Sequence, residues 1–313
     1  MDLFTNRKTF LASAGLIASS AFFNSSNLEA KNNKKSRKKV LRIAHITDIH
    51  IKPSQKAKKG LEKALHSIQS LKHPPDFILN GGDSILDSMF ASKSTTKSLW
   101  KTFQSIIKEE CSIPIYHCIG NHDVWGWGGK NSFKKDHLYG KSWVQEELNI
   151  KNPFYSFDRS NWRFVVLDSV HPNNNGYIAK LDDIQYDWLE KILYKTNMES
   201  NVCILSHIPI ICFCATFDGQ NEKSGNWNIP GAWMHIDARK IKTLFTKFKN
   251  VKLALSGHIH LHDKVEYLGV KYLCNGAVSG AWWKGSYQEV PPSYSIIDLY
   301  NDGSSENYFI PYS

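Results

Sequence analysis

The chain has 313 residues and a formal net charge of +10, and 42% of its residues are hydrophobic. Its six cysteines contain no Cys-x-x-Cys pair, which argues against a zinc ribbon or a thioredoxin-like centre. The positive charge lies mostly near the N-terminus, since residues 41–313 hold 31 basic and 27 acidic side chains, a net of +4. A DNA nuclease, which needs basic residues within its domain, therefore has little support from the charge.

The first 30 residues have the layout of an export signal. Arg7-Lys8 precede an uncharged run over residues 11–23, which is shorter than the about 20 residues of a membrane span. The stretch RKTFL at residues 7–11 also resembles a twin-arginine signal, with lysine in place of the second arginine. Because Leu28-Glu29-Ala30 is an imperfect cleavage site, a retained N-terminal anchor is the alternative. We expect an exported protein, periplasmic or membrane-anchored and facing outward, with a basic linker at 31–40 and one domain at 41–313.

Short apolar runs alternate with amphipathic helical patterns along that domain. The runs that predict strands cover residues 40–47, 77–80, 113–119, 163–167, 202–206, 252–256, 270–274 and 294–300. Apolar side chains at helical spacing occur over residues 61–71, 99–107, 181–192 and 236–248, where Ile184 and Ile236 are counted as core positions. Continuous apolar strands between such helices predict an α/β fold whose strands are buried on both faces.

Polar side chains follow five of these predicted strands. The groups are Asp48-Ile49-His50, Gly82-Asp83, Gly120-Asn121-His122-Asp123, His207 and Gly257-His258-Ile259-His260. Open α/β sheets place their sites at the carboxyl ends of strands, so we expect these groups to meet. Side chains two apart in an extended chain point to one side, and a preceding glycine permits a sharp turn.

Together these residues supply oxygen and nitrogen donors without thiolate. Such a set suits borderline to hard divalent ions such as Mn, Zn, Fe or Co, and it is too large for one tetrahedral ion. About enough donors are present for two ions, with a carboxylate between them. The sequence therefore predicts a site for two divalent metal ions, whose identity stays open.

The five blocks, in this order across residues 48–260, resemble the motif blocks of calcineurin-like metallophosphoesterases. The resemblance implies a two-sheet β-sandwich flanked by helices, a four-layer α/β/β/α fold with the metals at the strand ends. It assigns Asp48, His50 and His260 to the first metal and Asn121, His207 and His258 to the second. Asp83 would bridge the two ions.

The resemblance leaves His122 without a metal. In the family, the histidine of this block faces the substrate phosphate, and we expect it to protonate the leaving oxygen after attack by a hydroxide held between the ions. Either Asp87 or Asp123 is a candidate to orient His122, and both also fit the role of ordinary loop acids.

Two glycine-flanked tryptophan pairs follow the strand ends, Trp125 with Trp127 and Trp282 with Trp283. They are candidates to stack on a substrate, and packing beneath the loops is the equal alternative.

We expect metal-dependent hydrolysis of phosphate esters. Phosphodiesters are favoured by analogy with family members that carry the same blocks. The alternatives are a broad phosphomonoesterase or nucleotidase and a catalytically silent metal- or phosphate-binding protein. The expected partner is a small-molecule or polymeric phosphoester, without specific reading of nucleic acid. Membrane association through the N-terminus is open, as is the oligomeric state.

Overall fold

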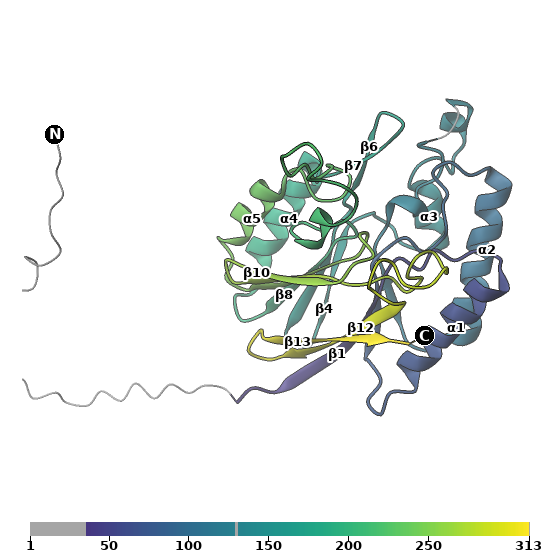
Figure 1. Ribbon diagram of the computed structural model, residues 1–313. Helices are drawn as coiled ribbons and strands as arrows, with labels where there is room; N and C mark the ends of the chain where they lie inside the picture. Colours follow the sequence, from purple (N-terminus) through teal and green to yellow (C-terminus); the bar gives the residue numbers. More distant parts are fainter. Residues whose placement is uncertain (1–35, 129–130, 313) are drawn as a thin grey trace, which may run out of the picture. The chain divides into compact units, whose positions relative to one another are not determined.

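The computed structural model describes residues 36–128 and 131–312, and β1 (Lys39–Ile46) is the first strand among them (Figure 1). The predicted export signal and residues 31–35 of the predicted linker lie outside the described residues. Lys39 and Val40, assigned above to the linker, are the first residues of β1. Arg37 also packs on the domain, where its guanidinium lies 2.7 Å from Glu306.

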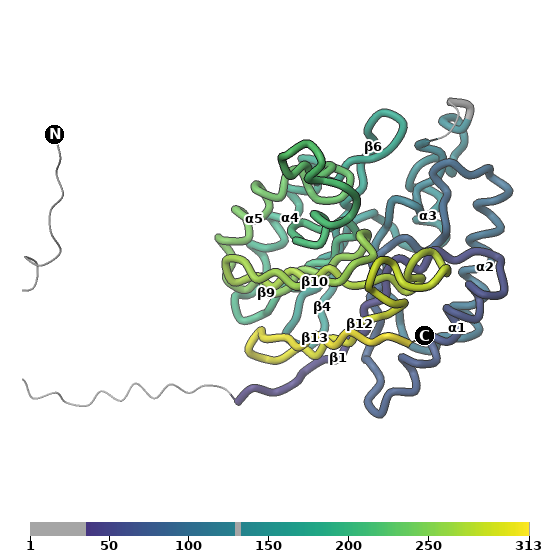
Figure 2. The backbone as a smooth tube through the Cα atoms, in the orientation of Figure 1, coloured from purple at the N-terminus to yellow at the C-terminus, as the bar shows by residue number. Residues whose placement is uncertain are grey.

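Two sheets carry the fold. The first has the order β13-β12-β1-β2-β3, with β2 (Phe77–Asn80), β3 (Ile115–His117), β12 (Ser293–Tyr300) and β13 (Ser305–Pro311). The second has the order β10-β11-β9-β8-β5-β4, with β4 (Tyr155–Arg159), β5 (Trp162–Val166), β8 (Asn201–Leu205), β9 (Val251–Ser256), β10 (Asp263–Tyr267) and β11 (Val270–Cys274). Figure 2 shows purple β1 beside yellow β12, although these paired strands lie far apart in the sequence. In the first sheet β1, β2 and β3 are parallel and run to the edge at β3, while β12 and β13 add to β1 in antiparallel order. In the second sheet β11, β9, β8 and β5 are parallel, and antiparallel β10 and β4 form the two edges.

Helices cover the outer face of each sheet (Figure 1). The first sheet is covered by α1 (Gln55–Gln69) and α2 (Lys93–Glu110), with the short α3 (Ser142–Glu147) packed beside α2. The second sheet is covered by α4 (Asp183–Lys195) and α5 (Ala238–Phe245). Single 3₁₀ turns form at η1 (Asn121–Asp123), η2 (Asn131–Lys135) and η3 (Cys214–Thr216). None of the helices among the described residues is both long and apolar enough to cross a membrane.

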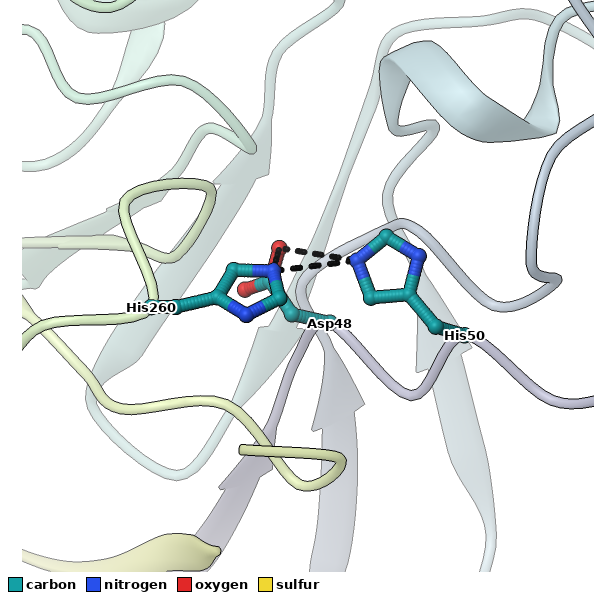
Figure 3. A group of neighbouring side chains, drawn as sticks. All are labelled: Asp48, His50 and His260. Atoms are coloured by element: carbon teal, nitrogen blue, oxygen red, sulfur yellow. Dashed lines mark hydrogen bonds and ion pairs between the residues drawn. The ribbon is translucent and has the colours of Figure 1, made fainter. Parts of the chain in front are cut away.

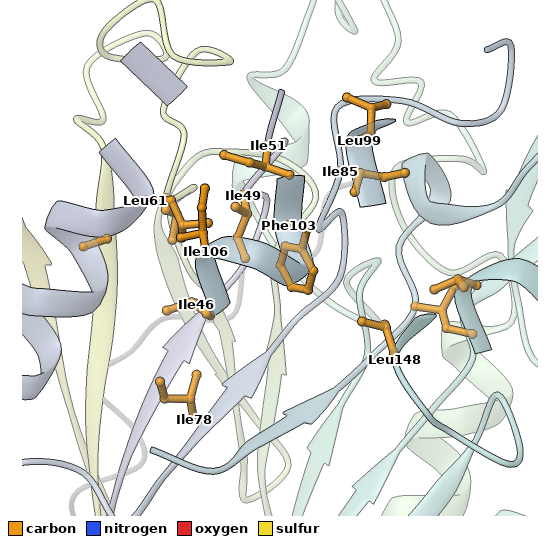
Figure 4. Close-up of a cluster of buried hydrophobic side chains, with 14 of the residues drawn as sticks. Ile46, Ile49, Ile51, Leu61, Ile78, Ile85, Leu99, Phe103, Ile106 and Leu148 are labelled. Carbon is orange, nitrogen blue, oxygen red and sulfur yellow. The ribbon is translucent and has the colours of Figure 1, made fainter. Parts of the chain in front are cut away.

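The apolar strands fill two kinds of core because successive side chains point to opposite faces of a sheet. In β1, Ile43 lies between the two sheets, whereas Ala44 and Ile46 pack under the helices. Figure 4 shows Ile46 and Ile78 of the first sheet near Leu61 of α1. Strands buried on both faces account for the continuous apolar runs, and the predicted four-layer α/β/β/α architecture is confirmed.

Each of the eight predicted apolar runs coincides with a strand, although the run at 113–119 is strand only at β3. The predictions omit β4, β10, β13, α3 and a separate two-stranded ribbon, β6 (Val170–Asn173) and β7 (Gly176–Ala179). Two predicted core positions are wrong: Ile184 is 76% exposed, and Ile236 precedes α5 and is 58% exposed. Ile184 faces solvent because α4 buries a narrow stripe of Gln185, Leu189 and Leu193, and Ile236 lies before the first turn of α5.

Candidate metal centre

The structure gathers all seven predicted metal ligands at the carboxyl ends of β1, β2, β3, β8 and β9. Six of them are at most 3% exposed, and His258 is half-buried. Three overlapping groups of side chains have donor atoms within 4.8 Å of one another, the spacing needed to hold a metal ion. The groups are Asp48 with His50 and His260, Asp83 with His207 and His258, and His50 with Asp83 and His122.

The backbone of the ligand loops is unusual. Five of the seven ligand residues have a positive φ, namely Asp48 (54°), His50 (47°), Asp83 (53°), His258 (71°) and His260 (61°). A left-handed conformation is uncommon for residues with a side chain, and each instance costs about 1–3 kcal/mol. The expectation that Asp48 and His50 converge through an extended chain is therefore wrong: both follow the end of β1 and converge by left-handed turns.

Gly120 and Gly257 matter because they lack a side chain, not because they adopt a conformation that other residues avoid. The predicted role of these two residues as turn formers is therefore corrected. Neither Gly120 nor Gly257 has a positive φ. A Cβ on Gly120 would lie 2.1 Å from Oδ1 of Asp83, and one on Gly257 would lie 2.3 Å from Oδ2 of Asp48. Glycine at these positions lets the backbone of one block approach the carboxylate of another.

The first ligand group joins the loop after β1 to the loop after β9 (Figure 3). Nε2 of His50 and Nε2 of His260 are only 3.0 Å apart. Nδ1 of His260 donates to the carbonyl of Gly280 at 2.6 Å, and Nδ1 of His50 is 3.4 Å from the carbonyl of Leu86. With both Nδ1 atoms turned to carbonyls, the two Nε2 atoms face each other.

The second ligand group is arranged in the same way. Nδ1 of His207 donates to the carbonyl of Gly81 at 2.9 Å. Its Nε2 faces three further groups, lying 3.1 Å from Oδ1 of Asn121, 3.2 Å from Nδ1 of His258 and 3.2 Å from Oδ2 of Asp83. Oδ2 of Asp83 also lies 3.7 Å from Nε2 of His50, so this carboxylate stands between the two groups.

These residues fit a pair of divalent ions because several of their ligand atoms are buried without a hydrogen-bond partner or face another acceptor. Oδ1 of Asp48 is buried without a hydrogen-bond partner, between His50 at 3.9 Å and His260 at 3.5 Å. Carbonyls that hold the far nitrogen of an imidazole are the usual support of a metal-binding histidine. An acceptor oxygen and two facing imidazole nitrogens in a buried site call for a cation.

The ionisation of the groups agrees with this fit. Burial lowers the pKa of His50 and of His258 well below the ordinary value, which keeps these rings neutral. Burial opposes the charge of Asp83, but His207 and His122 outweigh burial and hold the pKa of Asp83 well below its usual range. Burial likewise opposes the charge of His207, and Asp83 still raises the pKa of His207 to about 9. A proton on His207 therefore supplies the positive charge that Asp83 requires when no metal is present.

His122 lies beside the first group, with its ring 4.9 Å from the ring of His50 and its side chain 31% exposed. Its Nδ1 is 3.3 Å from Oδ1 of Asp87. Asp123 does not face His122, because its carboxylate accepts the backbone N–H groups of Gly120 and Ser84 at 2.9 and 2.8 Å. Of the two acids left open by the sequence, Asp87 is the partner of His122, and Asp123 ties the second and third blocks together.

The four tryptophans have different positions. Trp125 is 1% exposed and packs between Phe133 and Trp143, and Trp283 is 6% exposed with its Nε1 donating to the carbonyl of His50. Neither can offer an open ring face to a substrate, so this interpretation is wrong for both. Trp127 is half-buried against the helix-covered core. Trp282 differs from the other three because its ring lies against ligand side chains, 4.4 Å from the ring of His260 and 5.7 Å from that of His50.

The sequence model of the calcineurin-like phosphoesterase family matches residues 41–262. The chain belongs to this family. Its members depend on a pair of metal ions, which is what the two ligand groups around Asp83 are built to hold. The chain is therefore a metallophosphoesterase, a hydrolase of phosphoric esters, as the sequence motifs predict.

Two curated relatives and one solved structure are similar to this metallophosphoesterase. A 3',5'-cyclic-nucleotide phosphodiesterase of Nostoc is 24% identical over 297 residues, covering 89% of this chain and 96% of the relative. The 3',5'-cyclic adenosine monophosphate phosphodiesterase of Escherichia coli K12 is 22% identical, covering 84% and 87%. A dimetal phosphatase from Danio rerio superimposes with a TM-score of 0.60 at 14% identity, covering 88% of this chain and 100% of the other. The last likeness supports the fold alone.

Proposed function

We propose that this metallophosphoesterase hydrolyses small phosphodiesters of the 3',5'-cyclic nucleotide class. The observation that carries the proposal is the arrangement around Asp83, where two donor groups adjoin one free imidazole backed by a carboxylate. A diester needs both activation of water and protonation of a leaving alkoxide, and this arrangement provides for both. The names of the two curated relatives support the cyclic nucleotide as substrate.

Different residues of the chain would bind the metal ions and protonate the leaving group. Asp48, His50 and His260 would hold one ion, Asn121, His207 and His258 the other, and Asp83 both. When bound, such ions activate water and withdraw charge from the phosphoryl oxygens. Asp87 lies 3.3 Å from Nδ1 of His122, an ion-pair contact without the alignment of a hydrogen bond, and Nε2 is then the ring nitrogen that gives a proton to the departing oxygen. Asn121 adds a neutral donor where a second local carboxylate would over-neutralise the ions.

The proposal extends to the metal, the location and the domain organisation. The oxygen and nitrogen donors suit Mn, Zn, Fe or Co. The basic, then apolar, N-terminal layout supports an exported chain with a signal or anchor at residues 1–30. A basic linker then leads into the catalytic domain, whose first strand begins at Lys39.

The test compares a diester with its monoester. The full chain, stripped of metal and reloaded separately with Mn, Zn, Co or Fe, is assayed on bis(p-nitrophenyl) phosphate and p-nitrophenyl phosphate. The same preparations are then assayed on 3',5'-cyclic AMP and 5'-AMP. We expect a higher kcat/KM on the diester of each pair and no activity without metal.

Two outcomes contradict the proposal. A preference for both monoesters favours the phosphomonoesterase or nucleotidase, and full metal loading without activity on any ester favours the silent binding protein. The variant Asp187→Asn is a suitable control, because Asp187 is an exposed residue of α4, remote from the ligand loops.

A further inference from the structure

Tyr177 lies on the ribbon formed by β6 and β7, which projects from the body of the domain in Figure 1. The base of the ribbon is fixed: the N–H of Ala179 donates to the carbonyl of Gly231 at 2.8 Å, and the N–H of Ile236 to the carbonyl of Ala179 at 3.0 Å. Val170 and Ala179 at this base are fully buried. The ribbon is therefore a firm support for the side chains it carries.

The ring of Tyr177 stands edge-on to the ring of His258, at 6.0 Å between centroids and 83° between planes. Burial raises the pKa of Tyr177, and the negative charges of Asp83, Asp218 and Asp48 raise it further. Tyr177 is thus a neighbour of the second ligand group.

The hydroxyl of Tyr177 makes no hydrogen bond to another described residue, and its oxygen is not fully enclosed by protein. A phenol is a neutral O–H donor at neutral pH, so an accessible one beside the ligands is free for a bound molecule. Tyr287 makes the contrast clear. It also stands near the site, 5.5 Å from the ring of His260, but its hydroxyl donates to Asp218.

Two free donors thus flank different ligand groups. His122 is beside His50 of the first group, and Tyr177 is beside His258 of the second. We propose that the Tyr177 hydroxyl donates a hydrogen bond to a non-bridging oxygen of the substrate phosphoryl group. Tyr177 keeps its proton throughout: a water oxygen forms a bond to phosphorus and loses one proton to solvent, the bond from phosphorus to the leaving oxygen breaks, and that oxygen takes its proton from His122. The hydrogen bond strengthens as negative charge gathers on the phosphoryl oxygens.

This inference rests on the proposed phosphoesterase site, and its test separates the two. Metal-loaded full-length Tyr177→Phe is compared with wild type and with Tyr267→Phe, a control at an exposed tyrosine of β10. On bis(p-nitrophenyl) phosphate we expect kcat to fall about 10- to 100-fold, the effect of losing one hydrogen bond to a charged group, with KM little changed. A second readout is the Kd of inorganic phosphate by calorimetry, which we expect to weaken at least about 10-fold. Metal content and Tm should match wild type.

Unchanged kcat and unchanged phosphate Kd in Tyr177→Phe would overturn the inference. So would a loss of activity that follows a loss of metal, because that result makes Tyr177 a structural support of His258. If wild type prefers monoesters, the proposed diester substrate fails, yet the difference in phosphate Kd still decides the role of Tyr177.

Discussion

The two ends of the sandwich differ in whether their buried charged groups are paired with other protein groups. At the end where β1 begins, Arg42 and Asp298 face each other across β1 and β12 with hydrogen bonds of 2.6 and 2.7 Å, and Asp76 accepts the backbone N–H of Arg42. At the carboxyl ends of the parallel strands, Asp48 keeps a buried oxygen without a partner, and imidazole nitrogens face one another. At the Arg42–Asp298 end, the complete end, protein groups alone satisfy the buried charges. At the ligand end, the buried charges require bound cations.

The backbone differs in the same sense. The ligand residues after β1, β2 and β9 hold left-handed conformations, whereas no residue of β1 itself has a positive φ. Strain of this kind persists only where the surrounding structure maintains it, and it gathers at functional sites. The comparison teaches that stability and function reside at separate ends, so substitutions should affect one without the other.

Asp83→Asn tests the cation-dependent end most severely. Removing the charge shared by both ligand groups should lower metal occupancy below two ions per chain and lower kcat/KM by more than about 100-fold, the upper effect of losing an outer-shell support. Elemental analysis together with the diester assay measures both effects, and retention of two ions with wild-type activity would contradict the shared role of Asp83.

His122→Ala separates a catalytic group from a ligand. With both metals retained, kcat should fall about 10²- to 10⁴-fold, the usual contribution of a general acid. His137→Ala is the matched control, since the side chain of His137 is 77% exposed. An unchanged kcat at full metal content would remove His122 from the mechanism. Loss of an ion would make it a ligand, as its place in a group with His50 and Asp83 allows.

Asp298→Asn tests the complete end and should have the smallest effect on activity. Burial opposes its charge, but the hydrogen bond and charge of Arg42 outweigh burial and hold the pKa of Asp298 below 3.8. Its contribution to stability is therefore full above about pH 4 and is lost as the pH falls through the folded pKa. At pH 7 the variant should lose about 2 kcal/mol of unfolding free energy, the worth of a charged hydrogen bond, and keep its kcat. Urea denaturation from pH 3 to 7 should show a shallower acid loss than in wild type.

The sequence predicts the centre of the fold better than its edges, for a physical reason. Strands such as β1 and β8 are buried on both faces and appear as continuous apolar runs. The omitted strands β4, β10 and β13 are edge strands with many half-exposed or exposed residues, so no such run marks them. The strands β6 and β7 were not predicted from the sequence for a similar reason, because their polar, Asn-rich tip interrupts any apolar run.

The site was predictable where it depends on spacing within a block and unpredictable where it depends on contacts between blocks. The seven ligand residues are adjacent to strand ends, and their convergence follows from the parallel order of the strands. The pairing of Asp87 with His122 and the approach of Tyr177 to His258 are tertiary contacts without a local signal. The burial of Trp125 and Trp283 likewise depends on how their loops fold back on the core.

The most direct test of the central claim is a crystal structure of the metal-loaded protein with anomalous scattering recorded at the metal edge. The account predicts two ions, one bound by Asp48, His50 and His260, the other by Asn121, His207 and His258, with Asp83 touching both and His122 touching neither. A single ion, or His122 within bonding distance of a metal, would contradict it.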